Sequence, residues 1–153
     1  MKRFQIIAKH CLLPIVYCLL ILSSCKKDKT TPSNAPQIAF ISISPSKVVE
    51  YQDSIKIVIS YDDMDGDLGQ NDPNVSNMFI TDSRNSVTYN YRISQLAPSN
   101  ATIHIKGNLN IVIKNTAITD GSASQSLTYS IYVKDRAGNT SNTITTSAIT
   151  VTQ

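Results

Sequence analysis

The chain has 153 residues, of which 14 are basic and 11 are acidic, so its formal net charge is +3. This length suits one domain with short appendages. Three of the basic residues (Lys2, Arg3 and Lys9) precede an apolar segment. We expect these residues and the apolar segment to be removed together, which lowers the number of basic residues from 14 to 11 and the net charge to zero. The charge therefore gives no argument for nucleic-acid binding, and the sequence contains no nucleic-acid-binding motif.

The N-terminal segment has the pattern of a secretory signal peptide. The basic leader is followed by an apolar run at residues 11–22. A membrane-spanning helix needs roughly 20 apolar residues, whereas this shorter run suits the hydrophobic region of a signal peptide. A buried core helix is the alternative, but the N-terminal position and Pro14 argue against it.

The apolar run ends in Leu-Ser-Ser-Cys at residues 22–25. This stretch resembles the lipobox of bacterial lipoproteins, in which an aliphatic residue and two small residues precede the lipidated cysteine. The resemblance implies cleavage after residue 24 and lipidation of Cys25. Two or three acyl chains, at about 0.8 kcal/mol per buried CH₂, would make a stable membrane anchor. Cys11 and Cys18 would leave with the signal peptide, so no thiol remains for a disulfide.

Residues 25–36 are expected to form a flexible tether behind the lipidated cysteine. The segment is polar, contains two prolines and shows no hydrophobic periodicity, and its reach is roughly 18 Å. Surface-export signals of Bacteroidetes lipoproteins are similar in position but contain more acidic residues than the single Asp28 found here. We therefore expect a lipid anchor in the outer membrane. The domain can lie on either the periplasmic or the surface face of that membrane.

From Gln37 onward, apolar and polar residues alternate with a period of two, which predicts strands with one buried face. Three runs show this most clearly, at residues 54–61, 86–94 and 127–135. Weaker strands are expected at residues 37–44, 77–82, 102–106, 109–115 and 143–151, with a tight hairpin at Gly107 and Asn108. The side chains predicted to point inward are Ile55, Ile57, Ile59, Tyr61, Val87, Tyr89, Tyr91, Ile93, Leu127, Tyr129, Ile131 and Val133.

Seven or eight short strands with regularly spaced turns predict an all-β sandwich over residues 37–153, with a β-barrel as the less favoured alternative. Residues 129–151 resemble the last two strands of bacterial immunoglobulin-like or fibronectin-type modules. The loop "DMDGDLG" at residues 63–69 is similar to a loop of small Bacteroidetes lipoproteins and cadherin-like modules. These resemblances imply an immunoglobulin-like β-sandwich.

Residues 61–72 contain five aspartates and no basic residue. In an immunoglobulin-like fold the loop after residues 54–61 and the loop after residues 127–134 lie at the same end. We therefore expect Asp135 to lie near the group of Asp62, Asp63, Asp65 and Asp67. Carboxylates are ligands that Ca²⁺ prefers, so these five are the candidate calcium ligands.

The aspartate spacing does not match an EF-hand, because Leu68 replaces the expected glycine and Asn74 replaces the expected glutamate. The alternatives to a calcium site are a solvated turn, in which aspartate and glycine are common, and a direct contact with a protein or a glycan.

Few other residues suggest chemistry. His104 is the only histidine after the signal peptide and is expected on an exposed strand face. The sequence shows no catalytic triad spacing, no phosphate-binding loop and no second histidine for zinc, so we expect no enzymatic activity. Tyr51 and Tyr132 are the aromatic residues available for stacking on a sugar.

The expected function is that of a lipid-anchored cell-envelope protein acting as a non-catalytic binding or structural module, with calcium as a candidate stabilising ion. The alternative is a carbohydrate-binding or nutrient-uptake accessory lipoprotein. The expected partners are the membrane, through the lipid anchor, and an envelope protein or a glycan.

Overall fold

The computed structural model describes residues 34–153, so the predicted signal peptide, Cys25 and most of the tether lie outside the described residues. The described part contains ten strands and no helix. Accordingly, it has no helix long and apolar enough to cross a membrane. The strands are β1 (Gln37–Ser44), β2 (Lys47–Val49), β3 (Ile55–Asp63), β4 (Met78–Asp82), β5 (Thr88–Tyr91), β6 (Ile105–Ile113), β7 (Ser124–Leu127), β8 (Tyr129–Val133), β9 (Ile144–Thr145) and β10 (Ile149–Thr152).

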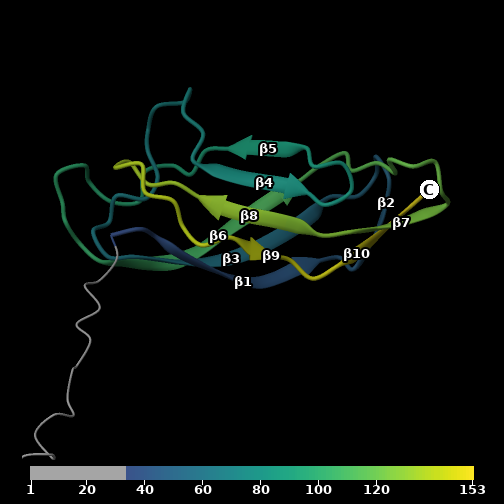
Figure 1. Cartoon of the computed structure of the whole chain (residues 1–153), viewed down its shortest axis with the longest axis horizontal. Coiled ribbons are helices and arrows are strands. Elements are labelled where there is room, and N and C mark those ends of the chain that lie inside the picture. Colours follow the sequence, from purple (N-terminus) through teal and green to yellow (C-terminus); the bar gives the residue numbers. More distant parts are fainter. Residues whose placement is uncertain (1–33) are drawn as a thin grey trace, which may run out of the picture. The chain divides into compact units, whose positions relative to one another are not determined.

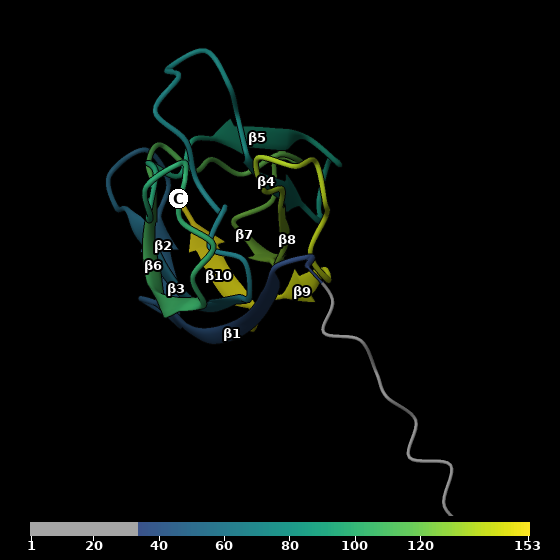
Figure 2. The same ribbon diagram turned by 90° about the vertical axis from the view of Figure 1, so that its left-hand side faces the viewer.

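The strands form three sheets, with the orders β1-β3-β6, β5-β4-β8-β9 and β2-β10-β7. All pairs are antiparallel except β2 and β10, which are parallel. A single residue separates β7 from β8 and three residues separate β9 from β10, so the second and third sheets continue one another. Figures 1 and 2 show β4 and β5 across the domain from β1. The prediction of an all-β sandwich is confirmed.

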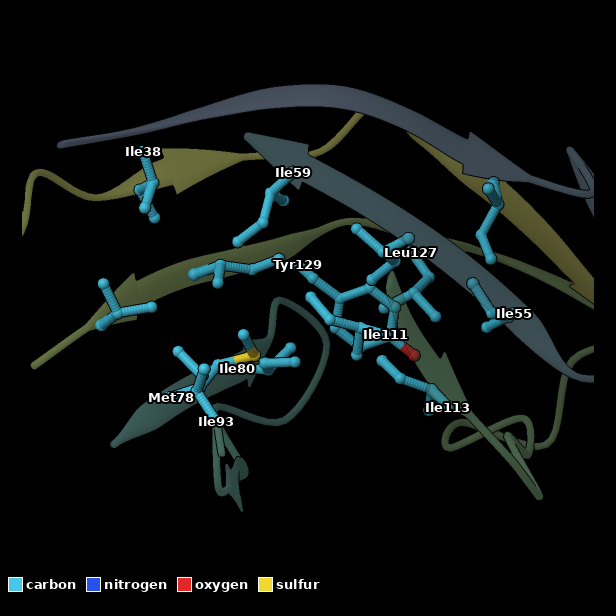
Figure 3. Close-up of a cluster of buried hydrophobic side chains, with 14 of the residues drawn as sticks. Ile38, Ile55, Ile59, Met78, Ile80, Ile93, Ile111, Ile113, Leu127 and Tyr129 are labelled. Carbon is cyan, nitrogen blue, oxygen red and sulfur yellow. The ribbon is translucent and has the colours of Figure 1, made fainter. Parts of the chain in front are cut away.

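The core lies between the sheets and is built mainly from the strands with the clearest alternation. Ile55, Ile57 and Ile59 of β3 have no exposed surface, and Ile131 and Val133 of β8 are equally buried. Figure 3 shows side chains from β3, β4, β6 and β8 meeting in this cluster. Complete burial of one such aliphatic side chain is worth about 1.5–3 kcal/mol, so these two strands anchor the fold.

The inward face predicted for residues 86–94 is wrong for its first half. Val87 and Tyr89 are 45% and 37% exposed, and Tyr91 is half-buried. The reason is that β5 is an edge strand and pairs only with β4. Ile93, just after the strand, is buried because the Asn77 side chain accepts its N–H at 2.6 Å and donates to its carbonyl at 3.2 Å.

The hairpin predicted at Gly107 and Asn108 is also wrong, because β6 passes through both residues without a turn. Gly107 pairs with Tyr61 of β3. A Cβ atom at Gly107 would lie 2.7 Å from the Tyr61 hydroxyl oxygen. The glycine therefore makes room for an aromatic ring on the neighbouring strand, and does not mark a reversal of the chain.

Candidate functional site

One end of the sandwich, which we call the loop end, carries three connections: residues 64–77 after β3, residues 92–104 before β6, and residues 134–143 after β8. Figure 1 shows these connections together at the end where the β8 arrow points. The first strand also begins there, because Gln37 pairs with Asp62 near the end of β3. The loop end therefore contains both the aspartate loop and the point where the chain enters the domain.

Asp63 is the last residue of β3 and continues its inward face, so its side chain has no exposed surface. Its Oδ2 atom accepts the Leu68 N–H at 2.8 Å, which folds the loop back over the strand end. Gly66 and Gly69 have positive φ angles of 72° and 80°. A Cβ atom at either glycine would lie 2.2 Å from a backbone oxygen of residues 92–104, so only glycine allows this close approach.

The fold brings three of the predicted aspartates together. Asp63, Asp65 and Asp67 each offer a carboxylate oxygen, and these oxygens lie within 4.8 Å of one another. The Oδ1 atom of each is buried and has no hydrogen-bond partner in the described part of the chain. We call these residues the aspartate trio. The trio presents acceptor atoms only, which is the requirement for holding a cation.

The pKa of Asp63 is raised to about 6, mainly by burial and also by the neighbouring Asp65 and Asp67 carboxylates, while the Leu68 N–H bond acts in the opposite direction. Burial, followed by the charge of Asp135, also raises the pKa of Asp67. Burial is the main cause of both shifts, so this site disfavours the charged forms of Asp63 and Asp67.

The other two predicted ligands, Asp62 and Asp135, are not part of the trio and bond to other residues. Asp135 is next to the loop, because it forms an isolated β-bridge with Leu68. However, its two carboxylate oxygens accept the backbone N–H and the side-chain amide of Asn139, at 2.7 and 2.8 Å. Asp62 contacts Lys106, at 2.8 Å, and His104. His104 itself is exposed, as expected.

Arg136 holds two connections of the loop end together and was not among the predicted site residues. Its guanidinium donates to the Gly69 carbonyl at 2.7 Å and to the Gly66 carbonyl at 3.3 Å. In addition, the Ala137 N–H donates to Oδ2 of Asp67 at 3.0 Å. The sequence gives no signal for Arg136, because its acceptors are main-chain oxygens nearly seventy positions away.

The two tyrosines considered for sugar stacking do not form one surface. Tyr51 follows β2, is 68% exposed and has a positive φ of 59°. Tyr132 lies on β8 and stacks on Phe79 of β4, with ring centroids 4.8 Å apart and an interplanar angle of 14°. The Lys134 ammonium lies 5.7 Å from the centre of the Phe79 ring. Phe79 is thus the aromatic partner that the sequence analysis missed.

Comparison with known proteins finds no match. No protein-family model, no curated protein and no solved structure is similar to this chain at a significant level. The functional argument therefore depends on the residues and geometry of this chain.

Proposed function

We propose that this chain is a lipid-anchored cell-envelope protein whose sandwich is a non-catalytic, immunoglobulin-like binding module. The lipobox-like residues 22–25 support the anchor. Two features support the immunoglobulin-like assignment. The first is that the sheet β5-β4-β8-β9 faces the sheet β1-β3-β6. The second is the parallel pairing of β2 with β10, which places the N-terminal strands β1 and β2 in different sheets. The partner is an envelope protein that meets the loop end.

The observation that carries this proposal is the position at which the chain enters the domain. Gln37 pairs with Asp62, so the point where the predicted tether, residues 25–36, joins β1 is at the loop end and not at the opposite end. A tether of this length has a reach of roughly 18 Å. The loop end is therefore the part of the domain closest along the chain to the lipid anchor. A surface in this place favours a partner that is itself in the membrane or at its face.

The loop end also has the properties of a preformed contact surface. Arg136 and the Ala137 N–H join the connections that follow β3 and β8, so little conformational freedom remains to be lost on binding. Met64 and Val75, both in the connection after β3, are 42% and 38% exposed. Exposed apolar side chains on a rigid loop provide the contact area that a protein partner would bury.

Site-specific crosslinking in cells tests the proposal. A photo-crosslinking amino acid placed at Val75 should capture an envelope protein, whereas the same amino acid at Tyr51, at the opposite end, should not. In parallel, Cys25→Ala should release the protein from membranes. Capture only from Tyr51, or unchanged membrane retention of the Cys25 variant, would contradict the partner surface or the anchor, respectively.

A glycan-binding role is the second candidate, and the stacked pair of Phe79 and Tyr132 favours it. Aromatic rings on a sheet face provide apolar area for the face of a sugar ring. If this role is correct, the protein is retained on envelope polysaccharide, free sugar competes with retention, and Tyr132→Ala abolishes it. Retention that survives Tyr132→Ala would exclude this surface as the glycan site.

A further inference from the structure

Asp63 is a completely buried carboxylate without a counter-charge. Its side chain has no exposed surface, and its Oδ1 atom has no hydrogen-bond partner. Within residues 34–153, none of the salt bridges includes a member of the aspartate trio. A buried charge of this kind is strongly unfavourable unless it is paired, protonated or bound to a metal ion.

Two of the three unpartnered oxygens of the trio are fixed in place by the bonds that the other oxygen of the same carboxylate makes. Oδ2 of Asp63 accepts the Leu68 N–H, and Oδ2 of Asp67 accepts the Ala137 N–H from the other connection. Each of these two carboxylates therefore uses one oxygen for the backbone and leaves the other buried and free. Oδ1 of Asp65 is the third buried oxygen. The three form a pre-arranged set of acceptors.

The Arg136 side chain does not neutralise this set. The Arg136 guanidinium donates to the carbonyl oxygens of Gly66 and Gly69. Within residues 34–153, Arg136 thus holds the loop and no cationic side chain forms a salt bridge with the three carboxylates, so a bound cation would supply the charge that they lack.

The donor set selects the kind of cation. All three atoms are carboxylate oxygens, whereas zinc sites in proteins are built mainly from cysteine and histidine. Oxygens within 4.8 Å of one another can surround one ion at the 2.3–2.6 Å that Ca²⁺ prefers. Mg²⁺ demands a more regular octahedron at shorter distances. We propose that Asp63, Asp65 and Asp67 bind one calcium ion, with water and main-chain oxygens completing its shell.

A calcium ion in this position would join two parts of the loop end. Asp63 belongs to β3, while Asp67 is bonded to the connection after β8 through the Ala137 N–H. The bound ion would replace repulsion among the three carboxylates with attraction to a common centre. It would therefore hold the loop against the strand end. This inference goes beyond the proposed function, because it depends on neither the lipid anchor nor the partner.

Calorimetric titration of the purified full chain, after treatment with a chelator, tests the proposal directly. We expect one calcium ion per chain, at a dissociation constant of roughly 0.1–1 mM or tighter, as in extracellular calcium modules. Asp65→Asn should weaken binding at least tenfold. Asp62→Asn removes the same charge from an exposed neighbour and should leave the affinity unchanged. The absence of calcium binding by the wild-type chain at about 10 mM, or equal affinity for Mg²⁺, would overturn the assignment.

Thermal unfolding separates a metal ligand from a residue with a purely structural role. In chelator, Asp65→Asn should raise the melting temperature, because it removes one repelling charge. In saturating calcium the order should reverse, with the wild-type chain the more stable. A shift of the same sign in both conditions would overturn the proposal. The wild-type response to calcium is itself decisive if the variant does not fold, and neither result depends on the crosslinking outcome.

Discussion

The two ends of the sandwich each contain an aspartate with no exposed surface, but the partners of the two carboxylates differ. Asp82 closes β4 at the end opposite the loop end, and Asp63 closes β3 at the loop end. Asp82 accepts two side-chain bonds from Arg84, at 3.0 and 2.8 Å, and the Arg84 N–H at 2.9 Å. Asp63 accepts one backbone N–H and faces two further carboxylates.

This difference shows how a chain can compensate for a buried charge. At the Asp82 end the counter-ion is part of the sequence, and Arg84 is itself fixed by the Ala117 carbonyl and the Gln125 side chain. The stability of the Asp82 end should therefore not depend on the ions in the buffer. At the loop end none of the salt bridges within residues 34–153 includes Asp63, and we propose that calcium supplies its counter-charge. The stability of that end should then depend on the medium.

Removing the internal counter-ion should have the largest effect. Arg84→Ala leaves Asp82 buried and unpaired, which costs about 3–5 kcal/mol in the free energy of unfolding. Because Arg84 lies away from the loop end, the loss should be the same in calcium and in chelator. Urea unfolding at neutral pH measures it.

Arg92 is the matched control for this substitution, because it is an exposed arginine with a single bond to the Gln70 carbonyl at 3.0 Å. Arg92→Ala should cost no more than about 1 kcal/mol. Adding Asp82→Asn to the Arg84 variant should recover part of its loss. If Arg84→Ala costs as little as Arg92→Ala, the Asp82 end is not held by its ion pair.

The main features of the fold could be predicted from the sequence, because they follow from alternation and chain order. The buried face of β3 is read directly from Ile55, Ile57 and Ile59. The prediction that Asp135 lies near the aspartate loop required only that the connections after β3 and β8 share one end. The structure agrees with this placement through the bridge between Leu68 and Asp135. Strand order alone thus predicted that the connections after β3 and β8 lie side by side.

What could not be predicted depends on contacts between residues distant in sequence. Gly107 looks like a turn residue until the Tyr61 ring is placed against it. Arg136 acts on carbonyl groups, which have no sequence signature. Asp62 and Asp63 are adjacent and chemically identical, yet they point to opposite faces of β3, one to Lys106 and the other into the core. A one-residue difference in strand position decides which aspartate belongs to the trio.

Glycine substitutions should show that the loop end is tightly closed. Gly69 and Gly121 both have positive φ angles, of 80° and 74°, but only Gly69 has a backbone oxygen 2.2 Å from where a Cβ would be. Gly121→Ala should cost about 1 kcal/mol from backbone strain alone. Gly69→Ala should cost about 3 kcal/mol, because the clash with the Ser94 carbonyl adds to the strain. Equal losses in urea unfolding would mean that the loop moves away freely.

Loss of the Arg136 side chain should lower both the stability of the fold and its affinity for calcium. Arg136→Ala removes the bonds to the Gly66 and Gly69 carbonyls, which we expect to cost about 2 kcal/mol. It should also weaken calcium binding, since the loop that carries Asp65 and Asp67 is no longer held. Arg84→Ala should leave calcium affinity unchanged in the folded protein. Unaltered calcium affinity in the Arg136 variant would show that the Arg136 bonds and the ion site are independent.

The smallest effect is expected at Tyr129, which begins β8 near the Asp82 end. Burial raises its pKa to about 12. A raised tyrosine pKa means that the folded state keeps a proton that the unfolded state loses above pH 10, so folding stability declines between about pH 10 and 12. Tyrosinate absorbance should therefore show a group that titrates near pH 12, which Tyr129→Phe removes at a cost of about 1 kcal/mol at neutral pH. If this late absorbance change persists in the Tyr129→Phe variant, another tyrosine is the one that titrates late. The core at the Asp82 end is then more accessible to solvent than the Arg84 contacts imply.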